Sequence, residues 1–449
     1  MSADEPPPRR LRVLVLAAFC DPEGRQAALI GHALTQALAN HADVHLVTAT
    51  ANAPALVRAG LREERDFTAI DIAWLTGWRD RIHRFLFGTD SERGWTVWQA
   101  LTLPAYRQFE RRVWRRFGKA IRAGDYDVVH RITPVTPALP SPIATRLART
   151  GVPFVVGPLN GGLAWPAAFA GLRKAEGEWL APLRGLARLL PDQRAMRRTA
   201  AAILIGSRDL MRRMPVADRD RAVYIPENGI DPARFPADAG AGRTPPGRPV
   251  RAIYLGRLVP YKGADMVIEA AASLLADGRM TLEIVGTGPM QDALAAQIAD
   301  LGLGQAVTLA GDVDHRAVQA KLAAADILCA PAVREFGGAV VMEAMAMGVV
   351  PIVVDYGGPP EYVGSDCGFL LPLSDRAGLV ARLRAVLAGI AEEPARLAPL
   401  SERGRQKAWA LFTWDAKARM VLAIYRWVLA GGGADKPSFG MPLDRVPTA

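Results

Sequence analysis

Cysteine is scarce in this chain, and long hydrophobic runs are absent from it. Its 449 residues include only three cysteines, Cys20, Cys329 and Cys367, which are odd in number and far apart. This pattern argues against a disulfide framework and against a cysteine-based zinc site. No apolar run approaches the roughly 18 residues that a membrane-spanning helix needs. We therefore expect a cytoplasmic protein.

The amino terminus places arginines before a short apolar stretch, as a signal peptide does. Its start is rich in proline and acidic residues, however, and it has no small-residue cleavage site. We interpret residues 11–18 as a first buried strand.

Positive charge exceeds negative charge. The chain has 55 Lys and Arg against 45 Asp and Glu, a formal net charge of +10. Such a balance favours an anionic partner, which could be a phosphate ligand, a lipid surface or a nucleic acid. No nucleic-acid-binding module is recognisable, so we do not expect nucleic acid as the partner.

Short apolar runs alternate with longer helix-like stretches, and the chain is too long for one hydrophobic core. Buried runs separated by helices are typical of parallel strands covered on both faces. The predicted strands are 11–18, 43–48, 126–131, 153–157, 202–206, 222–226, 251–256, 281–286, 306–311, 326–331 and 350–355. The sequence therefore predicts an α/β protein with two doubly wound Rossmann-like domains facing each other across a cleft.

The rhythm of strands and helices is interrupted once, by a segment rich in proline and glycine. We place the first domain at 1–232, a linker at 233–249 and the second domain at 250–412. A helix at 413–430 could then cross back to the first domain, and 431–449 is expected to be a disordered tail. Ligands of such folds bind beyond the carboxyl ends of the strands, which here means the cleft.

The stretch "REFGGAVVMEAMAMG" (334–348) sets two glutamates on either side of a glycine pair. Gly337 and Gly338 are expected to open a helix that stops at Gly348. The free amides at such a start form an anion site, in which a diphosphate can lie against the backbone. The amides of this site are expected at Gly337, Gly338, Ala339 and Val340. Glu335 and Glu343 would then bracket the diphosphate.

Two cations follow the first strand of the second domain, in "GRLVPYKG" (256–263). Arg257 and Lys262 could neutralise the charge that develops on a departing diphosphate. The alternative is a pair of solvated loop cations. Neither an Asp-x-Asp arrangement nor a histidine cluster accompanies them, so we expect no bound metal.

Together with "PENGID" (226–231) and "GGPPEYV" (357–363), these segments resemble retaining glycosyltransferases of family 4, with their E-x7-E motif and GT-B fold. The resemblance implies transfer of a sugar from a nucleoside-diphosphate donor to a glycan or lipid-linked acceptor, as in cell envelope polysaccharide synthesis. It implies retention of anomeric configuration and no cofactor beyond the donor. Glu335 would hold donor-sugar hydroxyls and Glu343 the ribose. A nucleotide-sugar epimerase and an inactive nucleotide-sugar-binding protein remain open as alternatives.

The same resemblance implies further contacts. His130, at the end of a predicted strand, would position the donor sugar, although a lone histidine can equally be structural. Gly286 and Val313 would border the nucleotide base. The family commonly has a Gly-Gly pair after the first strand, where this chain has Gly24 followed by Arg25, so Arg25 could supply a side-chain contact to phosphate.

Two other patterns have to be weighed. "VGTGPMQ" (285–291) begins like a dinucleotide fingerprint, but Gln291 stands where the third glycine belongs, which argues against NAD. The basic segment 107–124 has an apolar stripe at helical spacing. It could rest peripherally on anionic lipid at the inner face of the cell membrane, or it could pack its stripe into the core with solvated arginines outside.

Overall fold

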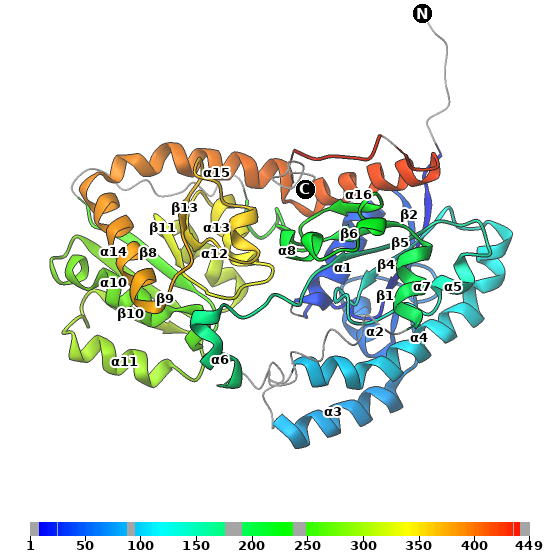
Figure 1. The fold of residues 1–449 in the computed structure, drawn as a ribbon, viewed down its shortest axis with the longest axis horizontal. Coiled ribbons are helices and arrows are strands. Elements are labelled where there is room, and N and C mark those ends of the chain that lie inside the picture. Colours follow the sequence, from blue (N-terminus) through cyan, green and yellow to red (C-terminus); the bar gives the residue numbers. More distant parts are fainter. Residues whose placement is uncertain are drawn as a thin grey trace, which may run out of the picture.

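The computed structural model describes residues 9–24, 26–87, 95–175, 191–236, 248–433 and 435–440. Within these residues the chain forms two domains, each built around one parallel β-sheet with helices on both faces (Figure 1). The prediction of two doubly wound α/β domains is confirmed. The predicted linker falls largely outside the described residues, as do Arg25 and most of the predicted tail.

The first sheet contains strands β1 to β7 and the second contains β8 to β13. The bounds of the first set are β1 Arg12–Ala17, β2 Asp43–Ala49, β3 Phe67–Ile70, β4 Val128–Thr133, β5 Phe154–Leu159, β6 Ala200–Ile205 and β7 Ala222–Tyr224. Those of the second are β8 Val250–Leu255, β9 Met280–Val285, β10 Val307–Gly311, β11 Ile327–Ala330, β12 Val350–Val354 and β13 Phe369–Leu371.

Helices connect the strands in both domains. In the first half of the chain they are α1 Ala27–Ala39, α2 Ala53–Arg58, α3 Ala73–Phe87, α4 Trp95–Ala123, α5 Ala144–Leu147, α6 Ala170–Ala175, α7 Pro191–Thr199, α8 Arg208–Arg212 and α9 Val216–Arg219. Of these, α6 lies beside the second domain, and its Leu172 packs against the core of that domain (Figure 1). The remaining ones are α10 Ala264–Ala276, α11 Gln291–Asp300, α12 His315–Ala324, α13 Ala339–Ala346, α14 Arg376–Glu392, α15 Leu397–Leu411 and α16 Trp414–Leu429.

Both sheets reverse their strand order in the middle. The first runs β3-β2-β1-β4-β5-β6-β7 and the second β10-β9-β8-β11-β12-β13, with every pairing parallel. Loops at the carboxyl ends of β1 and β4, and of β8 and β11, diverge at these reversals and leave a crevice. The two crevices face each other across the cleft.

The predicted strands are all present because each is an apolar run long enough to be buried on both faces. Every residue of β4 and β5 is buried, for example. Two strands, β3 and β13, were not predicted from the sequence. Both are short strands at sheet edges. All three cysteines are buried and unpaired.

The chain crosses between the domains at two places that lie side by side. The amide of Ile230 donates to the carbonyl of Phe412 at 2.8 Å, and the amide of Trp414 donates to the carbonyl of Ile230 at 3.1 Å. Beyond this point α16 returns to the first domain and packs on α1. A further bridge joins the domains: the hydroxyl of Tyr224 donates to a carboxylate oxygen of Glu361 at 2.6 Å.

The basic helix of the first domain is longer than predicted, because α4 already begins at Trp95. Its stripe of Phe109, Val113, Phe117 and Ile121 is buried in the domain core. The stripe is therefore not available to a lipid surface, and the interpretation as a core helix with solvated arginines describes α4. No helix in the described parts of the chain combines the length and apolar character needed to cross a bilayer.

Candidate active site

A cavity of about 1470 Å³ opens between the domains. Its first-domain wall includes Val135, which follows β4, and Asn160, which follows β5. Its second-domain wall includes Arg257, which follows β8, and Glu335, which follows β11. The cavity thus touches the point of reversed strand order in both sheets, where ligands of doubly wound folds bind.

The second-domain wall is built around the start of α13. Gly338 precedes the helix with φ 54°, a left-handed conformation that glycine adopts without strain. The amides of Ala339 and Val340 belong to the first turn, so they have no carbonyl partner within the helix. Gly348 lies just beyond the helix end with φ 73°, as predicted. The predicted helix start is therefore present, and Gly337, Gly338, Ala339 and Val340 line the cavity. Its role as an anion site stays a prediction.

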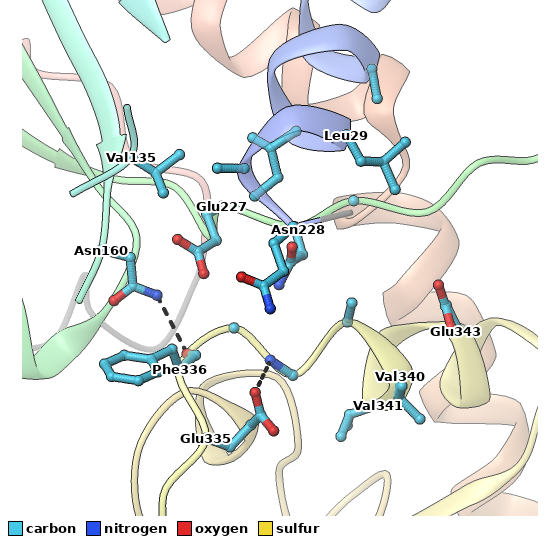
Figure 2. A pocket seen from close by; sticks show the side chains of 18 of the residues that line it. Leu29, Val135, Asn160, Glu227, Asn228, Glu335, Phe336, Val340, Val341 and Glu343 are labelled. Carbon is cyan, nitrogen blue, oxygen red and sulfur yellow. Dashed lines mark hydrogen bonds between the residues drawn. The ribbon is translucent and has the colours of Figure 1, made fainter. Parts of the chain in front are cut away.

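The first domain touches this glycine pair directly. A side chain at Gly337 would come within 2.2 Å of the Asn228 side-chain nitrogen and within 2.5 Å of a Glu227 oxygen. The side-chain nitrogen of Asn160 donates to the carbonyl of Phe336 at 3.4 Å (Figure 2). Only glycine at position 337 allows the two walls to approach this closely.

Glu335 meets one of the two predicted cations. Its carboxylate forms an ion pair with Lys262, and its other oxygen lies 3.5 Å from the amide nitrogen of Gly338. Arg257 lines the same wall. An acid, an ammonium group and a helix amino terminus therefore converge on one part of the cavity.

Glu343 lies further along α13 and also lines the cavity, on the side away from Glu335 (Figure 2). Burial raises the pKa of its carboxyl group, and the positive charge of Arg234 counteracts part of that increase. Arg234 lies at the start of the predicted linker and also lines the cavity, so Glu343 is near a positive charge from outside the second domain. The two glutamates thus lie on either side of the helix start, as the sequence suggested.

Glu227 is a cavity residue that sequence reasoning did not single out. It lies within the "PENGID" segment, and one of its oxygens is buried with no hydrogen-bond partner in the described structure. Burial raises its pKa to about 7. A hydrogen bond from Asn160 and the charge of Lys417 oppose this rise, and the charge of Glu335 adds to it. The segment's resemblance was visible in the sequence, but the burial of this carboxyl group was not.

Lys417, on α16, lies next to the segment that contains Glu227. Its ammonium group donates to the carbonyl of Pro226 at 2.6 Å, and burial lowers its pKa to about 7, with the charge of Glu227 acting against that shift. An acid and a base of similar pKa are therefore coupled beside the cavity.

His130 does not line the cavity. Its ring is fully buried, with Nε2 2.7 Å from the carbonyl of Gly157 and Nδ1 2.5 Å from the hydroxyl of Tyr425. A carbonyl only accepts, so Nε2 carries the proton and Nδ1 accepts from the tyrosine. Burial lowers the pKa of the imidazole to about 4. In this arrangement the histidine joins β4 to α16, and its predicted contact with the donor sugar stays a prediction.

Three other predicted residues are also not among those that line the cavity: Gly24, Gly286 and Val313. Gly24 closes a turn by donating its amide to the carbonyl of Asp21, and Val313 packs against the hydrophobic core. Their predicted contacts with the donor remain predictions. Among the described residues, no group of three or more His, Cys, Asp or Glu side chains is arranged to hold a metal ion.

The second-domain half of this site lies in a segment with recognised relatives. Residues 242–406 match a family model described as "Glycosyl transferases group 1". The chain is 30% identical over 174 residues to the MMP alpha-(1->4)-mannosyltransferase of Mycolicibacterium hassiacum, an alignment that covers 38% of this chain and 41% of that protein. The chain spans about half the length of the curated relatives it matches.

Solved structures resemble almost the whole chain. Sucrose-phosphate synthase from Thermosynechococcus elongatus has a TM-score of 0.61 at 19% identity, covering 94% of this chain and 100% of that one. HepE from Anabaena, in complex with UDP and glucose, has a TM-score of 0.54 at 16% identity, covering 94% and 99%. The fold is GT-B. In this GT-B chain the interdomain cavity contains Glu335, Lys262 and the start of α13 on its second-domain wall.

Proposed function

We propose that this protein is a glycosyltransferase that moves a sugar from a nucleoside-diphosphate donor to an acceptor. The observation that carries the proposal is the convergence of Glu335, Lys262 and the amino terminus of α13 on one wall of the interdomain cavity. The family match over 242–406 and the glycosyltransferases among the relatives support the same reaction class. HepE from Anabaena was solved in complex with UDP and glucose, so a uridine diphosphate sugar is a reasonable first donor to test.

The diphosphate would lie against the amides that open α13. Partial positive charge accumulates at a helix start, and the amides there can donate hydrogen bonds to phosphate oxygens. Lys262 and Arg257 would add two full charges beside them. As the bond to the sugar breaks, negative charge grows on the departing diphosphate, and fixed cations and amides stabilise that charge without reorganising.

The two glutamates would hold the sugars at either end of the diphosphate. Carboxylates accept hydrogen bonds from pairs of hydroxyl groups, which both a hexose and a ribose offer. Glu335 would bind the transferred sugar and Glu343 the ribose. The acceptor, a glycan or a lipid-linked sugar, would approach from the first-domain wall that contains Val135, Asn160 and Glu227.

In this proposal the donor is the only small molecule the reaction needs, and the anomeric configuration is retained. Fixed cations in the cavity supply the charge that a divalent ion provides in other transferases. No side chain is assigned as a covalent nucleophile. The acceptor would attack from the face that the diphosphate leaves, and a phosphate oxygen would take its proton. The protein would contribute positioning and charge stabilisation.

The first experiment is a thermal-shift screen of nucleoside-diphosphate sugars, with and without EDTA, because a ligand that binds the folded state raises the melting temperature. The stabilising donor is then incubated with candidate acceptors, and the anomeric configuration of the product is read by proton NMR. We expect transfer with retention that EDTA does not abolish. Conversion of the donor to an isomer without acceptor would indicate an epimerase, and binding without turnover an inactive binding protein.

A further inference from the structure

Helix α3 concentrates exposed hydrophobic side chains. Among the described residues eight large hydrophobic side chains are exposed, and four of them lie on this helix: Trp74 at 64%, Trp78 at 48%, Phe85 at 88% and Leu86 at 54%. Single exposed hydrophobic residues are ordinary on protein surfaces. Four within thirteen residues form a patch, and patches of this kind mark contact surfaces.

The three aromatic residues share one face. Trp74, Trp78 and Phe85 are four and eleven positions apart, which places them within about 40° of one another around a helix. The opposite face packs on α4, where His83 is buried and the guanidinium of Arg79 lies 4.9 Å from the ring centre of Trp98. The aromatic stripe therefore points away from the domain. Figure 1 shows α3 at the lower edge of the molecule, outside α4.

Positive charge borders this stripe. Arg81 and Arg84 are exposed on α3, whereas Asp80 is paired with Arg79 at 2.7 Å. Arg111 and Arg115 are also exposed, on the helix α4 against which α3 packs. A helix face of tryptophan and phenylalanine with arginines at its edge has the composition of helices that lie in the membrane–water interface.

We propose that α3 docks this protein on an anionic lipid bilayer, with Trp74, Trp78 and Phe85 in the headgroup region. The positions of the arginines favour a lipid surface over a second copy of the chain as the partner of this stripe. In a symmetric dimer over the stripe, the interface would contain Arg81 and Arg84 from both copies, and these like charges would repel. Anionic headgroups neutralise the same arginines.

Docking would also place the cavity near the lipid. Trp98, on which Arg79 of α3 stacks, lines the interdomain cavity. The membrane-facing helix is thus one side chain away from the cavity wall. This inference does not depend on the reaction, because lipid binding can be measured without donor or acceptor.

The test is vesicle flotation with the full-length protein. Vesicles of phosphatidylcholine alone are compared with vesicles that also contain phosphatidylglycerol, at low and high salt. We expect binding to the anionic vesicles, weakened by salt, and little binding to the neutral ones. Replacing Trp74 and Phe85 by serine should lower the partition coefficient by on the order of tenfold per ring. The double change Arg81→Gln and Arg84→Gln should lower it by about fivefold per charge, which corresponds to about 1 kcal/mol each.

Matched controls are available elsewhere on the surface. Val216→Ser removes an isolated exposed apolar side chain on α9, and Arg403→Gln removes an exposed charge on α15. Both should bind vesicles like the unaltered protein. Thermal unfolding of every variant checks that its fold is intact.

Two outcomes would overturn the proposal. One is a protein that does not float with anionic vesicles, or whose α3 variants float as well as the controls. The other is a concentration-dependent dimer that the Trp74→Ser and Phe85→Ser changes dissociate, in the absence of vesicle binding. That result would assign the stripe to a second copy of the chain.

Discussion

Lys262 and Glu335 form an ion pair at the wall of the interdomain cavity, although they lie 73 residues apart in the chain. Each side chain keeps about a quarter of its surface exposed, so solvent can reach the pair. A dianionic diphosphate at the start of α13 would compete with Glu335 for the ammonium group. The pair therefore holds both charges in place before a donor arrives.

Glu335→Gln tests the role of the carboxylate. The amide keeps the size of the side chain but loses the charge that strengthens hydrogen bonds to sugar hydroxyls. We expect turnover to fall by about 100-fold, which is about 2.7 kcal/mol of transition-state stabilisation. The matched control is Glu283→Gln, since Glu283 pairs with Lys321 on the surface of the same domain. Full activity in Glu335→Gln would show that the charge of Glu335 is not needed for the reaction.

Lys262→Ala tests the phosphate contact. Loss of one fixed cation should weaken the donor and the free nucleoside diphosphate by the same factor, roughly tenfold, because both carry the diphosphate. Titration calorimetry with the two ligands measures this. Lys321→Ala, which breaks the pair with Glu283, serves as the control. If the free nucleotide bound Lys262→Ala as tightly as the unaltered protein, the lysine would not touch phosphate.

Glu227 should make donor binding depend on pH. Its pKa of about 7 means that the carboxyl group is neutral below that pH and charged above it. Lys417, also with a pKa of about 7, gains its positive charge as the pH falls. Both changes make the region more positive at low pH, so we expect an anionic donor to bind roughly tenfold more tightly at about pH 6 than at about pH 8.

The variant Glu227→Gln separates the contribution of Glu227 to this pH dependence from that of Lys417. It removes the titration of the acid and should flatten most of the pH dependence, whereas Glu283→Gln should leave it unchanged. A sugar nucleotide is the suitable ligand, because its phosphates do not titrate in this range as the terminal phosphate of a free nucleoside diphosphate does. If the affinity of the unaltered protein for the sugar nucleotide did not change with pH, the charge of Glu227 would be too far from the diphosphate to influence its binding.

The second-domain site could be predicted from the sequence because it is local. Glu335, Gly337, Gly338 and Glu343 lie on one loop and the helix that follows it, so their spacing along the chain already fixes their spacing in the structure. The order of parallel strands then brings Lys262 to the same edge, since β8 and β11 are neighbours.

The first-domain wall could not be predicted in this way. Glu227 becomes a cavity residue only because the chain crosses between the domains next to it, and its pKa depends on Lys417, which is 190 positions away in the sequence. His130 lies near the end of the predicted strand 126–131, which suggested a ligand contact, but β4 continues to Thr133, and the hydroxyl of Tyr425 on α16 donates to Nδ1 of the buried ring. The sequence also did not predict the exposed aromatic stripe of α3. The exposure of a helix face depends on which other elements cover it, and the periodicity of the sequence does not show which elements those are.

His130 and Tyr425 should contribute to stability, and the structure gives a way to separate this from a role in donor binding. Tyr425→Phe leaves Nδ1 of His130 buried without a donor, which costs about 1 to 3 kcal/mol. His130→Leu removes the acceptor instead and should cost a similar amount. Because the two groups share one hydrogen bond, the double variant should be more stable than the sum of the single losses predicts. Denaturant unfolding of the four proteins measures the coupling.

The pH dependence of unfolding gives a second readout for His130. The folded state keeps the ring neutral down to about pH 4, whereas the unfolded chain takes up a proton near the ordinary pKa of about 6.5. The unfolded state therefore binds more protons between these values, and stability should fall as the pH is lowered from about 6.5 to about 4. His130→Leu should lose this part of the slope. His41→Gln is the control, since His41 pairs with Asp415 where both side chains are partly exposed. The opposite result would be a His130→Leu protein that is as stable as the unaltered protein but binds the donor at least tenfold more weakly. It would show that His130 contributes to donor binding.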